Sequence, residues 1–521
     1  MLNPRYLKLA AALVALGYTF ILAFGAHEGF PTGLTTGLAF PYLSDQPVGE
    51  DGYYLLLAAW NLARGEGLTA NFGEVVTGIQ PLMTFLLAGV AWLVQSFGGD
   101  KFDFARMMIL LGGVNLVAFA ALVDLVTRRA LDPSCDREGA GAIAFVIAAL
   151  SFYLFRTFTY GLETGLYLLL IAVLLLAMLR TFDDRRTQPG LAQAAFLGFL
   201  VGACGLARID FGVVTAIAFG ILFLMGRIGF VASAIAGVVA LAVTAPWFLW
   251  VHSVSGSFMP SSGPAQATLV DASSAAGRAD TMSLALAQNL APWAPLSYGP
   301  LTSLAVVIGL VVLVAFALRA GAGSPIWTNG ARALMGAWGA GVVVLPILYF
   351  TFFWAAHFYA RYTAPITILA IVVTAAAVVR LPRNVRTPLT YAAIAGFAVA
   401  NAIAAWQTHH RGGISDGHSV AAGYVARHLP KDARVGAFQS GVVGFYNENV
   451  INLDGKVNVD ALAAMRTKTV EEYVDSERIN YVIDWEGVID GLMPRAMKSG
   501  AWERCPLPVG NKETVCVMRK R

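Results

Sequence analysis

The sequence predicts a polytopic α-helical membrane protein, with roughly eleven to thirteen transmembrane helices and a small C-terminal α/β domain. Three observations indicate this fold class. The 521 residues are 57% hydrophobic and only 13% charged, which is typical of a membrane protein. Apolar runs long enough to cross about 30 Å of hydrocarbon recur along the chain. After residue 406 these runs shorten and charged residues become more frequent.

The apolar runs are the predicted membrane helices. The first run follows Arg5 and Lys8 and is interpreted as a retained transmembrane helix, because no small-residue cleavage site follows it cleanly. The runs cover residues 7–25, 79–97, 104–126, 140–154, 163–180, 191–207, 211–226, 228–250, 301–319, 333–353, 364–380 and 388–406.

Positive charge predicts which loops are cytoplasmic, since loops rich in Lys and Arg stay on that side. The net charge of +4 therefore reflects topology and not a nucleic-acid partner. The cytoplasmic loops carry Arg128–Arg129, Arg137, Arg180–Arg186, Arg227, Arg319–Arg332 and Arg380–Arg386. The outer segments are 155–162, 208–210, 251–300, 354–362 and everything after about 407.

One part of this topology is inconsistent. Glu50 is outside and Arg128 is inside, so an odd number of crossings must separate them. Two apolar runs, 79–97 and 104–126, lie between them. Either one run is re-entrant or interfacial, or a break divides one of them.

The chain is predicted to have two domains. Residues 1–406 form a transmembrane domain, with a first outer loop at 26–78 and a large outer loop at 251–300. Residues 407–521 form an extracytoplasmic α/β domain, because strand-like and helix-like segments alternate there. The predicted strands are 433–439, 450–453, 480–484 and 515–518, and the predicted helices are 420–428 and 470–478.

Two features of the C-terminal domain have alternative interpretations. Gly441 and Gly444 follow a predicted strand, but their spacing is not the dinucleotide fingerprint, and they are interpreted as turn residues. Cys505 and Cys516 flank a turn-like segment. They either form a disulfide or remain two thiols on adjacent strands.

Glu50 and Asp51 are adjacent carboxylates at the start of a predicted helix, residues 52–63. Acids at the mouth of a membrane bundle are costly unless they have a role. The positive end of the helix dipole keeps them ionised, as a general base requires. Gly65 is expected to end this helix.

Further polar residues lie at predicted outer membrane boundaries. Each one is also explained by capping or snorkelling at a helix end, but their common side favours a single outward-facing site. A transporter would instead place ionisable residues at mid-membrane depth. These residues are Glu163, Arg208, Asp210, His357, Arg361 and Tyr362.

The order and spacing of these motifs resemble the GT-C superfamily, which contains polytopic glycosyltransferases that use polyprenyl-phosphate sugars. The resemblance covers residues 1 to about 410, and its first block is most similar to the bacterial arabinofuranosyl- and mannosyltransferase-like branches. The segment Asn452–Asn458 also resembles one that recurs in such bacterial proteins. The matching blocks are the acid pair and residues 58–68, 71–82, 161–164, 206–210 and 361–365.

The resemblance implies an inverting glycosyltransferase, with residues 1–406 as its catalytic domain. It would act at the outer face of the bacterial cytoplasmic (inner) membrane, moving a sugar from a polyprenyl phosphate to a cell-envelope glycan, glycolipid or protein. Glu50 or Asp51 would accept the proton of the acceptor hydroxyl. The position of Glu50 favours it as the base, but the first acid is usually Asp in the family, so Asp51 is kept beside it.

The growing charge of the leaving phosphate needs fixed cations, and Arg208 and Arg361 are assigned to it. Tyr362 and His357 are assigned as supporting donors. Glu163 and Asp210 are expected to orient the arginines, contact sugar hydroxyls or help bind a divalent cation. A divalent cation is therefore possible, but no cofactor is required and no metal ligand is assigned.

The sequence departs from the family pattern in its large outer loop. Residues 256–263 resemble the loop that closes over the donor, but the basic residue expected shortly after it is missing, and Gln266 lies nearby. Two alternatives to an enzyme stay open. One is a non-enzymatic polytopic protein such as a lipid-linked-glycan transporter, and the other is a catalytically inactive GT-C-like protein that binds glycan.

Overall fold

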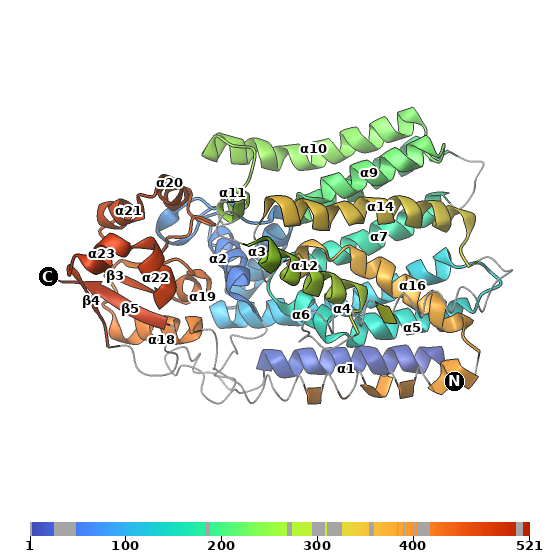
Figure 1. Ribbon diagram of the computed structural model, residues 1–521, viewed down its shortest axis with the longest axis horizontal. Helices are drawn as coiled ribbons and strands as arrows, with labels where there is room; N and C mark the ends of the chain where they lie inside the picture. Colours follow the sequence, from blue (N-terminus) through green and yellow to red (C-terminus); the bar gives the residue numbers. More distant parts are fainter. Residues whose placement is uncertain are drawn as a thin grey trace.

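The computed structural model contains two parts along its long axis (Figure 1): a bundle of long, roughly parallel helices, and a smaller part with strands that holds the C-terminus. The N-terminus lies at the end of the bundle that is farther from this smaller part. The structure describes residues 3–24, 48–182, 188–267, 274–293, 308–309, 326–353, 359–382, 417–506 and 514–520, with short pieces between 384 and 403.

The predicted multi-pass membrane architecture is confirmed. Among the described residues, five helices are long and apolar enough to span a membrane, or six if the bent pair α5 and α6 is one span. The spanning helices are α1 (Pro4–Phe24), α4 (Lys101–Ala130), α7 (Thr164–Phe182), α10 (Phe230–Ser255) and α14 (Asn329–Phe352), and the bent pair is α5 (Arg137–Leu150) and α6 (Phe152–Thr159). Shorter apolar helices are α3 (Pro81–Ser96), α8 (Leu191–Ala207), α9 (Phe211–Leu224) and α16 (Ile366–Arg380).

The remaining helices of this part are short or less apolar. They are α2 (Glu50–Ala63), a 3₁₀ turn (Asn71–Gly73), α11 (Ser262–Ala267), α12 (Ala275–Leu290) and α15 (Tyr359–Tyr362). The expected total of crossings stays a prediction, because the apolar runs 301–319 and 388–406 lie largely outside the described residues.

The long helix α4 illustrates how local sequence sets the ends of a span. Asp100 accepts hydrogen bonds from the backbone N–H groups of Phe102 and Asp103, and the Asp103 side chain accepts one from Asp100, which forms a capping box. Arg128 and Arg129 stand in the last turn, where positive charge is favourable. Polar ends around an apolar centre are what a membrane span requires.

Helix α3 resolves the inconsistency between Glu50 and Arg128. Just before α3, Gly78 lies against the backbone of Lys456 in the C-terminal domain. Just after α3, the Nζ atom of Lys101 donates to the Phe445 carbonyl of the same domain at 2.7 Å. Both ends of α3 therefore lie on one side of the bundle, and α4 alone crosses between the two sides.

Within its described residues, the C-terminal part is a five-stranded mixed sheet covered by short helices. The strand order is β2-β1-β3-β5-β4, with β1 parallel to β2 and β3 and with β5 antiparallel to β3 and β4. The strands are β1 (Val435–Ala437), β2 (Val450–Asn452), β3 (Tyr481–Trp485), β4 (Trp502–Arg504) and β5 (Thr514–Arg519). The helices are α18 (His418–His428), α19 (Gly441–Tyr446), α20 (Val459–Thr467), α21 (Val470–Ser476), α22 (Glu486–Leu492) and α23 (Pro494–Lys498).

The four predicted strands and two predicted helices of this domain are present, whereas the interpretation of Gly441 and Gly444 as turn residues is wrong. Both glycines belong to helix α19. A Cβ atom on Gly441 would lie 2.1 Å from the Glu50 carbonyl oxygen and 2.8 Å from its carboxylate. Gly441 therefore allows α19 to pack closely against the start of α2, a requirement that local sequence does not reveal.

The sheet domain is joined to the helical domain mainly through α2 and the turn after it. The Asn71 amide donates to the carbonyls of Gly444, Asn447 and Val450, at 2.9, 2.9 and 3.0 Å. Tyr53 of α2 packs on Phe445, with ring centroids 5.2 Å apart. Buried residues of both domains belong to one continuous hydrophobic core. The two parts therefore form one packed unit rather than two tethered ones.

Glu74 is a titratable group in the same interface. Burial raises the pKa of Glu74 to about 8, and the carboxylates of Glu477 and Asp460 also raise this pKa. Arg434 and the Tyr473 hydroxyl oppose the shift. The carboxyl thus keeps its proton in the folded protein at a pH where an exposed Glu has lost it.

The structure decides between the two interpretations of Cys505 and Cys516, because a disulfide joins them. The backbone N–H of Cys505 also donates to the Cys516 carbonyl at 2.9 Å. The bond links the end of β4 to β5 across a sequence separation of 11 residues. Cys135 and Cys204 do not form a disulfide.

Candidate active site

A cavity of about 650 Å³ lies where one end of the helical bundle meets the C-terminal domain. Segments from across the whole sequence line it, including α2, the α8–α9 junction, the end of α14, α15 and the loop before α20. Its charged residues are Asp51, Glu163, Arg208, Asp210, Arg361 and Lys456. Residues from 51 to 456 therefore converge on one space.

Asp51 reaches this cavity from the first turn of α2. The helix packs closely on the turn before α7: a Cβ atom on Gly52 would lie 2.5 Å from the Tyr160 carbonyl oxygen. Gly161 in that turn has a φ of +84°, which is favourable for glycine. Because these two residues are glycines, the backbone of the first turn of α2, which carries Asp51, packs directly on the turn that precedes Glu163.

Glu50 points elsewhere, although it precedes Asp51 directly. Its two carboxylate oxygens accept hydrogen bonds from the backbone N–H groups of Gly441 and Val442, at the start of α19. Burial raises the pKa of Glu50, while His418 and these two N–H groups oppose the shift. Among the described residues that line the cavity, Asp51 is present and Glu50 is not.

Arg208 is held by a dense set of buried partners. Its Nε and Nη2 atoms donate to the two oxygens of Asp210 at 3.1 and 3.0 Å, and its Nη1 atom donates to Glu163 at 2.6 Å. The Tyr349 hydroxyl accepts from Nη2 at 3.2 Å and donates to Asp210 at 2.6 Å. Buried charges of this kind need such pairing, and the fork of Arg suits a bidentate contact. Arg208 is therefore a fixed charge whose donors are largely occupied.

Arg361 and Tyr362 complete this side of the cavity. The Arg361 Nε atom lies 3.7 Å from a Glu163 oxygen. The side chain of Arg361 is 19% exposed, against 4% for Arg208, so Arg361 is the more accessible arginine. The Tyr362 ring stacks on Tyr349 at 4.3 Å and lies under the Arg208 guanidinium at 4.7 Å. The cations thus rest against π faces as well as carboxylates.

Every predicted site residue that the structure describes, except Glu50, lines this cavity, and His357 lies outside the described residues. The sequence analysis did not name Lys456 or Tyr349 as site residues. Lys456 lies in the segment 452–458 that the resemblance singled out, so a signal existed. Tyr349 sits in an apolar helix and gave no signal.

The Nζ atom of Lys456 lies 3.2 Å from an Asp51 oxygen and 3.4 Å from an Asp454 oxygen. Burial lowers the pKa of Lys456, but the carboxylates of Asp51 and Asp454 outweigh it and hold this pKa above its usual value. The ammonium is therefore charged throughout the physiological range.

The acids of the cavity are paired with these cations rather than with one another. Among the described residues, no group of three or more His, Cys, Asp or Glu is placed to hold a metal ion. The expectation that no cofactor is required and that a divalent cation is possible stays a prediction.

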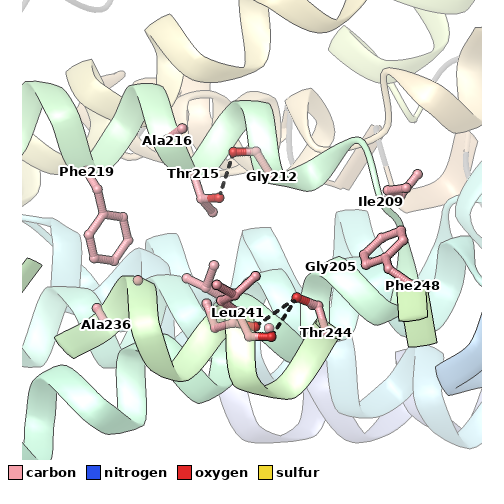
Figure 2. Close-up of a pocket in the computed structure, with 14 residues that line it drawn as sticks. Gly205, Ile209, Gly212, Thr215, Ala216, Phe219, Ala236, Leu241, Thr244 and Phe248 are labelled. Atoms are coloured by element: carbon pink, nitrogen blue, oxygen red, sulfur yellow. Dashed lines mark hydrogen bonds between the residues drawn. The ribbon is translucent and has the colours of Figure 1, made fainter. Parts of the chain in front are cut away.

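An apolar groove of about 360 Å³ adjoins the cavity along α8, α9 and α10 (Figure 2). Ile209 lines both spaces. The groove contains glycines that provide no side chain to fill it, and the hydroxyls of Thr215 and Thr244 bond to carbonyls of their own helices. Its wall is therefore apolar, and it leads from the charged cavity along the membrane helices.

Solved structures share this architecture at low sequence identity. ArnT from Cupriavidus metallidurans bound to undecaprenyl phosphate matches with a TM-score of 0.60 and 12% identity, over 98% of this chain and 97% of that chain. The Archaeoglobus fulgidus oligosaccharyltransferase, solved with a tethered acceptor peptide, matches with a TM-score of 0.53 and 11% identity, over 92% and 69%.

The chain has the GT-C fold.

The GT-C resemblance inferred from short motifs is thereby confirmed at the level of the fold. Residues 402–516 match a family described as a domain of unknown function, DUF8728. No curated protein sequence matches the chain. The charged cavity lies where one end of the helical bundle meets the part of the chain that matches DUF8728.

Proposed function

We propose that this protein is an inverting glycosyltransferase that moves a sugar from a polyprenyl phosphate to a cell-envelope glycan, glycolipid or protein. The observation that carries the proposal is the cavity itself, in which the carboxylate of Asp51 and the arginines share one space at the end of the membrane helices. A base and fixed cations are the two kinds of group that displacement at a sugar phosphate needs.

Asp51 is the proposed base. In a single displacement, the acceptor oxygen forms a bond to the anomeric carbon while the bond from that carbon to the phosphate oxygen breaks. The acceptor proton passes to the Asp51 carboxylate. Glu50 is less suited to this step, since both of its oxygens already accept backbone hydrogen bonds.

The leaving group is a polyprenyl phosphate, whose charge grows from one to two negative units as the bond breaks. Arg361 is the more accessible arginine and is proposed to contact the phosphate. Arg208 adds fixed positive charge and is itself oriented by Glu163 and Asp210. Such preorganised charge stabilises the transition state without reorganisation.

The apolar groove beside Ile209 suits the isoprenoid tail of such a donor. A lipid phosphate has a charged head joined to a long apolar chain. The charged cavity suits the head, and the adjoining apolar groove suits the chain. The neighbouring ArnT structure was solved with undecaprenyl phosphate, which supports this donor class. The acceptor peptide in the oligosaccharyltransferase structure keeps a protein acceptor among the candidates.

We place the site at the periplasmic or exterior face of a bacterial inner membrane. The described end of the bundle opposite the cavity carries Arg128, Arg227 and Arg386, each held by loop or helix-end partners. An excess of positive charge favours the cytoplasmic side. The cavity would then face outward, where nucleotide sugars are absent and an activated donor must arrive through the membrane.

The charge pattern of the described spans favours an enzyme over a transporter. In α4, for example, no Asp, Glu, Lys or Arg stands between Arg106 and Asp124. Transport sites near the bilayer midplane commonly use polar or charged groups there.

The test is an assay of the purified protein against a panel of polyprenyl-phosphate sugars, measuring release of the free polyprenyl phosphate. We expect turnover with at least one donor, its loss in Asp51→Asn, and wild-type activity in Asp490→Asn, an exposed aspartate of the C-terminal domain. Movement of a lipid-linked glycan across the membrane of proteoliposomes, without sugar transfer, would instead support the alternative of a lipid-linked-glycan transporter. Glycan binding without turnover would support the inactive relative.

A further inference from the structure

Among the described residues that line the cavity, Lys456 is the charged residue that the C-terminal domain supplies. It lies in the loop between β2 and α20, about four hundred residues after Asp51 in the sequence. Its side chain is 22% exposed, so the ammonium faces the cavity rather than a sealed core.

We propose that Lys456 is a ligand of the donor phosphate and that the arriving phosphate draws it away from Asp51, which frees that carboxylate to act as the base. This assignment rests on the proposed function of the cavity. It makes the C-terminal domain a part of the donor site and not a separate binding module.

The charge balance of the cavity supports a role for this cation. Among the described residues that line the space, three are carboxylates and three are cations. Without Lys456 the lining would carry a net negative charge, and a phosphate would meet net repulsion. Arg208 cannot easily turn to a phosphate, because its donors already serve Glu163, Asp210 and Tyr349.

The backbone around Lys456 is fixed by the membrane domain. The Ser261 hydroxyl donates to the Lys456 carbonyl at 2.8 Å. Gly78 packs so closely on the same carbonyl that a Cβ atom there would lie 1.8 Å from it. Three segments that are distant in sequence thus meet at this peptide, which holds the start of the lysine side chain at the cavity wall.

The exchange is a change of partner at the tip of the Lys456 side chain. In the structure the ammonium is shared between Asp51 and Asp454. Asp454 also accepts the Lys456 backbone N–H at 2.9 Å, so it retains the lysine when the contact to Asp51 is given up. Lys is suited to this exchange, since its ammonium is a point charge with three donors on a flexible stem.

The chemistry of the transfer balances with Lys456 protonated throughout. The donor is a phosphodiester with one negative charge, and the product polyprenyl phosphate carries two. The acceptor proton goes to Asp51, and the ammonium keeps its three protons and binds the growing charge. The contact should therefore strengthen from substrate to transition state.

The experiment measures binding of two probes, undecaprenyl phosphate and undecaprenol, to the full chain in detergent. We expect the wild-type protein to prefer the phosphate. Lys456→Gln should lose at least about tenfold in affinity for the phosphate and keep its affinity for the alcohol. Lys456→Arg should restore most of the preference. Lys498→Gln, which removes an exposed lysine of the same domain, should behave as wild type.

Thermal stability of each variant controls for folding, and Lys456→Met provides a second neutral variant. If the wild type prefers the phosphate and folded Lys456→Gln keeps the same preference, the assignment of Lys456 is overturned and the proposed function stands. If the wild type shows no preference, the proposed donor class fails and the assignment fails with it. With an active donor, kcat/KM should fall further than phosphate affinity in Lys456→Gln, and equal losses would contradict the strengthening contact.

Discussion

The two adjacent acids should respond differently to neutralisation, and this difference is the sharpest test of the site. Glu50→Gln should weaken the junction between the domains, because both Glu50 oxygens accept backbone N–H groups of α19. The Gln side chain keeps one acceptor and turns a donor toward the other N–H group. A hydrogen bond to a charged group contributes about 1.5–3 kcal/mol, so we expect the variant to lose about 2–4 kcal/mol of unfolding free energy.

Asp51→Asn should instead remove activity and leave the fold nearly intact. Loss of a general base costs typically 10²–10⁴ in rate. The melting temperature should change less than in Glu50→Gln, since Asp454 still pairs with Lys456.

The two effects are separable in one set of preparations. Melting temperature and hydrogen exchange at the amides of Gly441 and Val442 report the junction, and the initial rate of polyprenyl phosphate release reports the chemistry. A Glu50→Gln protein with unchanged melting and exchange but no activity would refute this reasoning and make Glu50 the base. Full activity in Asp51→Asn would exclude Asp51 as the base.

Three further predictions follow from other parts of the structure. Arg208→Lys should lower both kcat/KM and melting temperature, because Lys cannot reproduce the two-oxygen contact with Asp210, and wild-type values for both would contradict this role. The pKa of Glu74 is raised to about 8 in the folded protein, so between about pH 4.5 and 8 the folded chain keeps this proton while the unfolded chain has lost it. The free energy of unfolding should therefore fall across that window by at most about 1.4 kcal/mol per pH unit. Glu74→Gln should flatten the dependence of melting temperature on pH relative to wild type. Replacing Cys505 and Cys516 by Ser should cost roughly 2–3 kcal/mol of stability, measured by thermal unfolding, and an unchanged midpoint would argue against the disulfide.

Local patterns predicted the elements of this chain well. The apolar runs within the described residues became helices, since a membrane span must satisfy its backbone hydrogen bonds internally. The charge of the loops predicted correctly that Glu163, Arg208 and Arg361 lie at one end of the bundle. The strands of the C-terminal domain followed from short apolar segments between turn residues. Each of these features depends on residues close together in the sequence.

The sequence by itself therefore determined the membrane fold, the α/β character of the last hundred or so residues and the gathering of Glu163, Arg208 and Arg361 at one end of the helical bundle. Only the tertiary structure decided which charged residues meet. Neighbouring residues in a helix point about 100° apart, so Glu50 and Asp51 meet different surroundings: Glu50 contacts the start of α19, and Asp51 lines the cavity. The sequence did not predict an ion-pair partner for Lys456, because Asp51 comes close to it only when the C-terminal domain packs on α2. Local sequence patterns do not predict burial or contacts between distant segments. At this site, those contacts decide which partner each charged side chain meets.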